Sequence, residues 1–207
     1  MSKTTDMTDW YWVRHGPTHE KTFVGWRNVA VDLSNTELIN RIALFLPETA
    51  VVVSSDLRRS VETANALEHD RKRLSNEVGL REFNFGDWDG KHFSDVSKTD
   101  PILSRAYWDN PGDIEAPNGE SWNMAAQRAR TVVDRLSKKY DQIIAVAHFG
   151  IILTQVQRAL GTSAYECLSQ KIDNFSITHL QEKNGKWQLN YVNTLCLLYT
   201  SPSPRDS

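Results

Sequence analysis

Three short apolar runs, each followed by polar residues and then by a helical pattern, constrain the fold more than any other feature of the sequence. They read WYWVR at 10–14, AVVV at 50–53 and QIIAVA at 142–147. Strands that are apolar along almost their whole length are typical of parallel sheets covered on both faces. Because helical segments alternate with these runs, we expect an α/β fold. It would be a three-layer sandwich with a mostly parallel central sheet and helices on both faces.

The segments between the runs carry the boundary signals of helices. Ser34 and Glu37 form a capping-box pattern, and Pro47 ends the helix that follows it. Further helices are predicted over 57–67, from Pro101, from 120 or 121 to about 140, and over 151–160. Two segments at 174–180 and 187–192 surround an Asn-Gly turn, which predicts a hairpin and an antiparallel edge strand.

The length of 207 residues suits one globular domain. Residues 1–9 are polar and precede the first run, so we assign the domain to 10–195. Residues 196–206 read CLLYTSPSPRD, which matches the translation of one frame of a transposon-based sequencing adapter. We therefore expect 196–207 to be a non-native tail, with a natural tail rich in Ser and Pro as the alternative.

Charge and cysteine content argue against several classes of function. The 24 Lys and Arg residues nearly balance the 26 Asp and Glu residues, so no overall field would attract nucleic acid or an anionic membrane. The basic cluster at 71–73 lies beside Glu68 and Asp70, a pattern that favours a solvated face. The 2 cysteines are too few for a disulfide framework, and no apolar run reaches membrane-spanning length. Without a signal-peptide pattern, we expect a cytoplasmic protein.

Chemically active side chains stand at the ends of all three runs. Arg14 and His15 end the first run, Arg59 follows the second, and His148 follows the third. In open α/β sheets, binding sites form beyond the carboxyl ends of the strands. If the three strands are neighbours, two imidazoles and at least one guanidinium group meet in one pocket. Arg58, which precedes Arg59, is expected to be a solvated helix residue.

Such a pocket suits a phosphoryl group. Guanidinium groups bind phosphate through paired hydrogen bonds and stay charged at any relevant pH. A neutral imidazole is a competent nucleophile toward phosphorus, and a phosphohistidine intermediate divides hydrolysis into two easier displacements that require no metal ion. The leaving alkoxide then needs a proton from a buried carboxylic acid. Glu82, in an aromatic-rich loop between 77 and 92, is the candidate.

Five sequence blocks, in order, resemble the histidine phosphatase (phosphoglycerate-mutase-like) superfamily. The blocks are RHGPT at 14–18, SDLRRSVETA at 55–64, LRE at 80–82 with Gly86, NGES at 118–121 and AH at 147–148. The resemblance implies that His15 is the phosphorylated nucleophile and that Glu82 is the proton donor, with no cofactor and no metal. The phosphate contacts that it implies are Arg14, Thr18, Arg59 and His148.

Three features of the sequence separate it from other members of that superfamily. Lys21 stands where many members have Asn, and Phe149 stands where Gly is usual. Glu82 is followed by FNFG at 83–86, unlike the Arg-His-Tyr-Gly run of the cofactor-dependent mutases, which favours net hydrolysis. The segment at 80–90 is similar to that of the small phosphatases that include α-ribazole phosphatase.

We therefore predict a metal-independent phosphomonoester hydrolase that acts on a small phosphorylated metabolite through a phosphohistidine. Two alternatives stay open. One is a cofactor-dependent phosphoglycerate-type mutase, and the other is a non-catalytic module that binds a phosphorylated ligand. The identity of the substrate and the oligomeric state do not follow from the sequence.

Overall fold

The computed structural model describes residues 3–195 and contains one five-stranded sheet. The strands are Met7–Arg14 (β1), Val51–Ser54 (β2), Gln142–Ala147 (β3), Ile177–Lys183 (β4) and Lys186–Thr194 (β5). Their order is β2-β3-β1-β4-β5, in which β2, β3 and β1 run parallel and β4 pairs antiparallel with β1 and β5. The predicted α/β fold with an antiparallel edge is confirmed. The tail predicted to be non-native, 196–207, lies outside the described residues.

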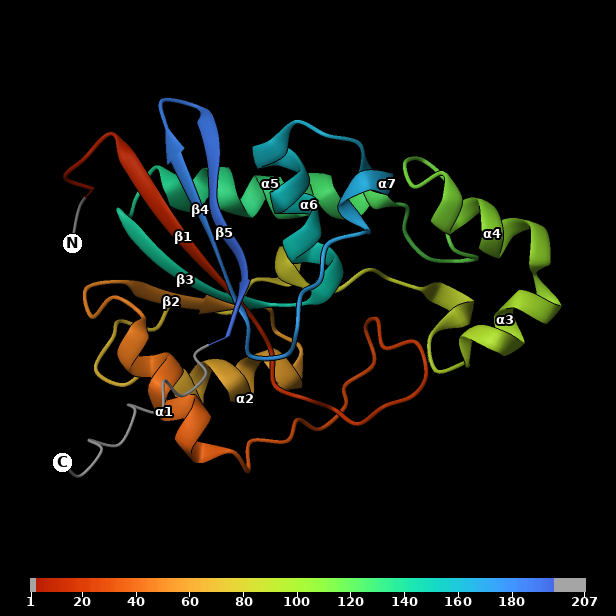
Figure 1. Cartoon of the computed structure of the whole chain (residues 1–207), viewed down its shortest axis with the longest axis horizontal. Coiled ribbons are helices and arrows are strands. Elements are labelled where there is room, and N and C mark those ends of the chain that lie inside the picture. The colour runs from red at the N-terminus through yellow and green to blue at the C-terminus, as the bar shows by residue number, and fades with distance from the viewer. Residues whose placement is uncertain (1–2, 196–207) are drawn as a thin grey trace, which may run out of the picture.

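Helices cover both faces of the sheet (Figure 1). The helices α1 (Thr36–Phe45) and α2 (Arg58–Leu67) lie on one face, and α5 (Trp122–Ser137) and α6 (Phe149–Leu160) lie on the other. A pair of helices, α3 (Phe93–Thr99) and α4 (Pro101–Asp109), projects away from the sheet. The short elements are the 3-10 turns η1 (Val78–Leu80) and η2 (Gly86–Trp88) and the helix α7 (Ala164–Cys167).

The core is divided by the sheet into two apolar clusters. Alternate residues of β1 enter different clusters: Trp10 and Trp12 pack on one side, while Tyr11 and Val13 pack on the other. Successive side chains of a strand point to opposite faces. A strand covered by helices on both faces must therefore be apolar at consecutive positions, which is why the first run shows no alternation.

The strand order brings the carboxyl ends of β1, β2 and β3, which carry or precede the candidate site residues, to the same end of the sheet. β3 lies between β2 and β1, and Arg14 at the end of β1 pairs with Ala147 at the end of β3. The His15 N–H donates to Ala147 O at 3.1 Å, and the Ser55 N–H donates to Val146 O at 3.1 Å. The three strands are therefore neighbours, as the convergence argument requires.

Three local features differ from the sequence predictions. β1 begins at Met7, so residues 7–9 belong to the sheet and not to the polar leading segment. Thr8 tolerates burial there because its hydroxyl donates to Ser137 O at 3.0 Å. The cap of α1 is Asn35 and not Ser34, since the Asn35 Oδ1 accepts the first-turn N–H of Leu38 at 3.0 Å. The sequence does not predict α3, because Val96 is its one buried residue and one apolar position shows no helical period.

Two structural findings bear on the partners considered above. The prediction of a solvated basic face at 71–73 holds for Lys72, which is exposed, and is wrong for Arg71. The Arg71 guanidinium donates to Ala43 O at 2.6 Å, Leu46 O at 2.7 Å and Pro47 O at 2.8 Å. These bonds satisfy carbonyls at the end of α1 and give Arg71 a structural role. Within residues 3–195, no helix is long and apolar enough to cross a membrane.

Candidate active site

His15 is buried at the end of β1, with 6% of its surface exposed. Its Nδ1 lies 2.7 Å from Gly16 O, so Nδ1 carries the proton and Nε2 carries the lone pair. The Arg59 Nε–H donates to this Nε2 at 3.2 Å. Local chain geometry therefore sets the tautomer of His15 and aims its lone pair at a cationic group.

The protonation state of His15 follows from its surroundings. Burial lowers the pKa of His15 to about 3, and the neighbouring Arg59 and Arg14 guanidinium groups lower this pKa as well, against the Gly16 carbonyl that raises it. The imidazole is consequently neutral at ordinary pH. A neutral imidazole with an oriented Nε2 lone pair is the form required for nucleophilic attack.

His148 lies beside His15, and the centroids of the two rings are 5.1 Å apart. The Nε2 of His148 is within hydrogen-bond distance of Ser55 Oγ at 2.8 Å and Ser60 Oγ at 3.2 Å. Its Nδ1 is buried with no hydrogen-bond partner in the described part of the chain. Burial holds the pKa of His148 well below its usual value, with a further lowering by Arg59. The free Nδ1 makes His148 suited to contact a ligand that binds beside His15.

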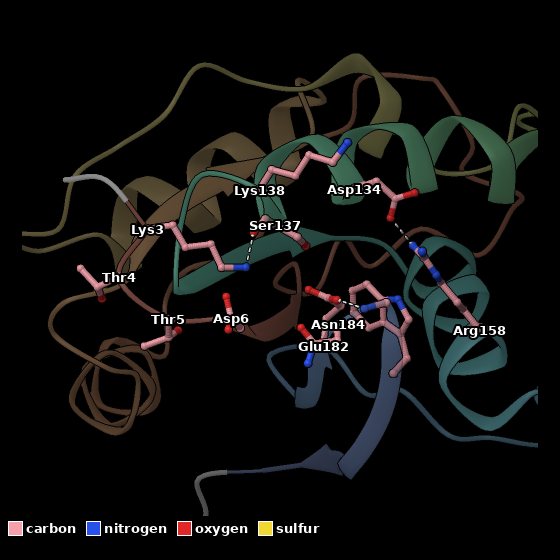
Figure 2. A pocket seen from close by; sticks show the side chains of 12 residues that line it. Lys3, Thr4, Thr5, Asp6, Asp134, Ser137, Lys138, Arg158, Glu182 and Asn184 are labelled. Atoms are coloured by element: carbon pink, nitrogen blue, oxygen red, sulfur yellow. Dashed lines mark hydrogen bonds and ion pairs between the residues drawn. The ribbon is translucent and has the colours of Figure 1, made fainter.

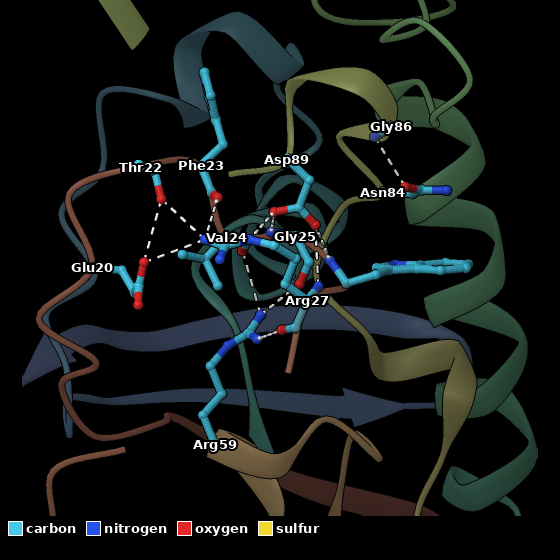
Figure 3. Close-up of polar contacts among 11 residues, drawn as sticks. Glu20, Thr22, Phe23, Val24, Gly25, Arg27, Arg59, Asn84, Gly86 and Asp89 are labelled. Atoms are coloured by element: carbon cyan, nitrogen blue, oxygen red, sulfur yellow. Dashed lines mark hydrogen bonds and ion pairs between the residues drawn. The ribbon is translucent and has the colours of Figure 1, made fainter. Parts of the chain in front are cut away.

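Arg59 is almost completely buried, with 1% exposure, and it is held by a loop that precedes α1 in the chain. Figure 3 shows its guanidinium group donating to Arg27 O at 3.0 Å and to Gly25 O at 2.8 Å. The Asp89 carboxylate holds the same loop by accepting the backbone N–H groups of Gly25, Trp26 and Arg27 at 3.0–3.1 Å. Burial lowers the pKa of Arg59 to about 10, which leaves the group charged at neutral pH.

Arg14, which is half-buried, provides the second guanidinium group at this end of the sheet. Its Nη1 donates to Ile172 O at 2.6 Å, and its Cζ lies 5.5 Å from the centroid of the Phe149 ring. Its Nε is buried and has no hydrogen-bond partner among the described residues. Burial lowers the pKa of Arg14, while Glu82 and Asp173 raise it. Phe149, at a position where the superfamily usually has Gly, therefore packs against a predicted phosphate-binding residue.

Glu82 lies in the loop between η1 and η2. Its side chain is buried against the start of α6, and 7% of the residue is exposed. Its Oε1 accepts the Phe83 N–H at 3.0 Å, and its Oε2 accepts the Gly150 N–H at 3.2 Å. Burial raises the pKa of Glu82, and this effect outweighs the opposing influence of those hydrogen bonds and of Arg59 and Arg14. Gly150 allows the close approach, because a Cβ atom there would lie 2.7 Å from Oε1.

The other residues considered from the sequence lie outside this cluster. Thr18 is half-buried four residues after β1, and its side chain makes no hydrogen bond within residues 3–195. Lys21 is exposed, and the exposed Arg58 pairs with Glu62 at 2.7 Å, one helical turn away. The phosphate contact of Thr18 remains a prediction, while the solvated position of Arg58 is confirmed.

Sequence reasoning missed residues that hold the site from a distance in the chain. The Asn174 side chain donates to His15 O at 2.8 Å and to Gly16 O at 3.2 Å. The Thr63 hydroxyl accepts the Gly16 N–H at 3.1 Å. Thr63 lies in one of the five quoted blocks, which could have drawn attention to it. No motif singles out Asn174, whose contact depends on the return of the chain into β4.

A separate hollow of about 670 Å³ lies at the opposite edge of the sheet (Figure 2). Two of its cationic side chains are bound within the wall: the Lys3 Nζ donates to Ser137 O at 2.8 Å, and Arg158 pairs with Asp134 at 2.6 Å. None of the predicted site residues lines it. The strand-end cluster around His15 is therefore the candidate active site.

The part of the chain that contains this cluster matches a known protein family. The profile of the histidine phosphatase superfamily (branch 1) matches residues 10–195. The chain belongs to this superfamily. The prediction of a histidine phosphatase, a phosphoric monoester hydrolase, is thereby confirmed at the level of the enzyme class.

Similarity to individual proteins extends over most of the chain. Phosphoglycerate mutase-like protein 4 of Arabidopsis thaliana is 28% identical over 200 residues, which cover 91% of this chain and 86% of that protein. The adenosylcobalamin/α-ribazole phosphatase of Escherichia coli is 30% identical over 127 residues, which cover 59% of this chain and 62% of that protein. The crystal structure of the α-ribazole phosphatase from Shigella flexneri has a TM-score of 0.78 at 21% identity, covering 90% of this chain and 96% of that structure, so the two share a fold.

Proposed function

We propose that this histidine phosphatase hydrolyses small phosphomonoesters without a metal ion, through a phosphohistidine formed on His15. The observation that carries the proposal is the state of His15. It is a neutral imidazole whose Nδ1 proton is held by Gly16 O and whose Nε2 lone pair faces the Arg59 guanidinium. The proposed nucleophilic atom, His15 Nε2, is thus in direct contact with the cation that we propose to bind the phosphoryl group, Arg59.

In the first step, His15 Nε2 attacks the phosphorus atom, and a P–N bond forms as the P–O ester bond breaks. The phosphoryl group takes the place of the Arg59 N–H at the lone pair. The charges of Arg14 and Arg59 then stabilise the equatorial oxygens in the transition state, and His148 Nδ1 contacts one of them. The leaving alkoxide takes the proton of the Glu82 carboxyl group and departs as an alcohol.

In the second step, a water molecule attacks the phosphorus atom of phospho-His15. The Glu82 carboxylate left by the first step accepts a proton from this water. The P–N bond breaks, inorganic phosphate leaves, and His15 and Glu82 return to their starting states. Glu82 therefore acts first as an acid and then as a base, so no net proton is consumed at the site.

The segment after Glu82 favours hydrolysis over return of the phosphoryl group to an organic acceptor. Phe83 and Phe85 are buried in the larger apolar cluster, and the stretch 83–86 contains no Lys or Arg. A mutase must hold a second anionic group of its substrate, and this stretch offers no cation for it. Because His15 and Glu82 are both more than nine-tenths buried, we also propose that the substrate is a small metabolite and not a nucleic acid.

Product analysis distinguishes hydrolysis from the two alternatives. The chain is incubated with 3-phosphoglycerate, with and without 2,3-bisphosphoglycerate, and with 4-nitrophenyl phosphate. We expect release of inorganic phosphate from 4-nitrophenyl phosphate and no formation of 2-phosphoglycerate. Formation of 2-phosphoglycerate that depends on the bisphosphate would establish a mutase. Binding of inorganic phosphate without turnover of any phosphomonoester in a metabolite panel would establish a binding module.

The pH dependence of kcat/KM is expected to fall on the alkaline side through loss of the Glu82 proton. The pKa of Glu82 is raised by burial, so the acid form persists above the usual range of a carboxyl group and is lost as pH increases. The pKa of His15 is lowered to about 3, so the nucleophile stays neutral over the same range. We therefore expect higher kcat/KM at mildly acidic than at alkaline pH.

The variant Glu82→Gln provides the control for this profile. The substrate itself titrates, because a phosphomonoester has a second pKa of about 6, and that contribution is the same for both proteins. Glutamine cannot supply the proton, so the part of the alkaline decline that belongs to Glu82 should disappear from the variant. Identical alkaline limbs in the two proteins would exclude Glu82 as the acid.

A further inference from the structure

Arg128, in the second turn of α5, binds the backbone of the segment that carries Glu82. Its Nη1 donates to Gly79 O at 3.0 Å and to Arg81 O at 2.6 Å. Its Nη2 donates to Glu82 O at 2.8 Å. One guanidinium group therefore holds three carbonyls within four consecutive residues, and the last of them belongs to Glu82 itself.

Glu120 completes this arrangement on the other side of Glu82. The Arg128 Nε and Nη2 each lie 2.8 Å from a different carboxylate oxygen of Glu120. The same carboxylate accepts the Asn84 N–H at 2.9 Å, and the Glu120 N–H donates to Asn84 O at 2.8 Å. The ion pair therefore holds the chain before and after Glu82.

The orientation of the Glu82 carboxyl group depends on this backbone. Its Oε1 is bound by the N–H of the next residue, Phe83, so any shift of the segment moves both the side chain and its hydrogen-bond donor. The Trp26 indole also donates to Glu82 O at 2.7 Å, and the Trp26 ring lies 5.9 Å from the Arg128 Cζ. A proton donor is efficient only within hydrogen-bond reach of the leaving oxygen.

We propose that Arg128 and Glu120 form a positioning pair for the proton donor of the reaction. Neither residue touches the substrate. They fix the backbone at 79–84 so that the Glu82 carboxyl group faces the leaving oxygen. This proposal rests on the proposed function, in which Glu82 is the acid. An ordinary structural ion pair would affect every step when it is lost. Loss of Arg128 or Glu120 should impair only one chemical event, the protonation of the leaving group.

The leaving group of the substrate provides the test. Benzyl phosphate releases a strongly basic alkoxide that requires a proton, whereas 4-nitrophenyl phosphate releases a weakly basic phenolate that does not. For Arg128→Met, we expect kcat/KM to fall about 30-fold with benzyl phosphate, because a small misplacement of a catalytic group costs up to about 100-fold. With 4-nitrophenyl phosphate, we expect a fall of less than about 3-fold, since the proton contributes little there. kcat/KM is the proper quantity because it reports the step that transfers the phosphoryl group to His15.

Arg135→Met is the matched control. Arg135 lies two turns further along α5 and pairs with Glu77 at 2.8 Å, but it binds none of the carbonyls at 79–82. We expect its kcat/KM to be unchanged with both substrates. Arg128→Lys should behave like Arg128→Met, because a single ammonium group cannot replace a planar group that binds three carbonyls and a carboxylate. This variant retains the charge and provides the test if Arg128→Met does not fold.

Two outcomes would overturn the proposal. One is an equal loss with the two substrates in the folded Arg128 variants, which is the mark of a general structural role. The other is no loss at all. Glu82→Gln, assayed in parallel, distinguishes a wrong assignment of the acid from a wrong assignment of the positioning pair. If Glu82→Gln lacks the dependence on leaving group, the proposed acid is wrong; if it shows the dependence and the Arg128 variants do not, only the positioning pair is wrong.

Discussion

Replacing His15 by alanine is expected to abolish turnover of 4-nitrophenyl phosphate, with kcat/KM reduced about 10⁵-fold or more. The variant lacks the only atom proposed to form the P–N bond, and no other imidazole of the cluster has the same orientation. In His148 the Nε2 is occupied by the hydroxyls of Ser55 and Ser60. Rapid acid-free quenching of the wild type during turnover should trap an acid-labile phosphohistidine that is missing from His15→Ala.

Two controls accompany this experiment. His69→Asn changes an exposed histidine at a left-handed φ of 46°, where asparagine is tolerated, and its kcat/KM should equal that of the wild type. The wild type should also keep full activity after treatment with EDTA. Inactivation by EDTA that added divalent metal reverses would contradict the metal-independent mechanism, and wild-type turnover by His15→Ala would contradict the nucleophile.

Replacing Arg59 by methionine is expected to lower kcat/KM about 10³-fold, because a cation aimed at a transferring phosphoryl group is worth about 10³-fold or more. Arg59 is buried, donates to the nucleophilic atom of His15 at 3.2 Å, and contributes to the lowered pKa of that imidazole. Its removal takes away both the charge that binds the phosphoryl group and the anchor of the loop at 24–27. Competitive inhibition by inorganic phosphate should weaken in parallel.

Arg58→Met is the adjacent control for this prediction. Arg58 has an exposed side chain that pairs with Glu62 along the helix, and an exposed pair of this kind contributes little to stability. Its kcat/KM and its inhibition by phosphate should match those of the wild type. Comparable losses in Arg58→Met and Arg59→Met would show that the region as a whole, and not the buried guanidinium, is responsible.

The catalytic candidates were accessible from the sequence because they stand next to features that are local. His15 and His148 each follow an apolar run directly, and Arg59 follows the second run by six residues. The end of a strand can be predicted from composition over a few residues, and parallel neighbours bring their ends to one edge. For His15, Arg59 and His148 to come together, the chain then needed only the strand order that places β3 between β2 and β1.

The supporting residues were not accessible in this way. Asn174 contacts a residue 159 positions earlier in the chain, and Arg128 contacts carbonyls 46–49 positions earlier. Their partners are backbone carbonyls, which every residue possesses, so no residue type at the other end of the contact marks the pairing. Sequence patterns identify Arg128 as one more polar residue of a helix.

Local competition explains the smaller errors. Ser34 and Asn35 are both good capping residues. Asn35 is the cap because the Ser34 N–H donates to the Asp32 carboxylate at 2.8 Å, which holds Ser34 outside the helix. Arg71 was expected in solvent because its neighbours are charged. The end of α1 supplies it with free carbonyls, and the sequence does not show that α1 ends beside it.

The sequence by itself determined the α/β class through its apolar runs and the superfamily through five blocks that resemble it. It also gave the residues that we propose to react, because runs, blocks and strand ends are properties of short segments. Only the tertiary structure decided their chemical states. The neutral, oriented imidazole of His15, the raised pKa of the buried Glu82 carboxyl group and the ion pair of Arg128 with Glu120 arise from desolvation and from hydrogen bonds between distant segments. These effects exist only once the chain has brought such segments together and excluded water.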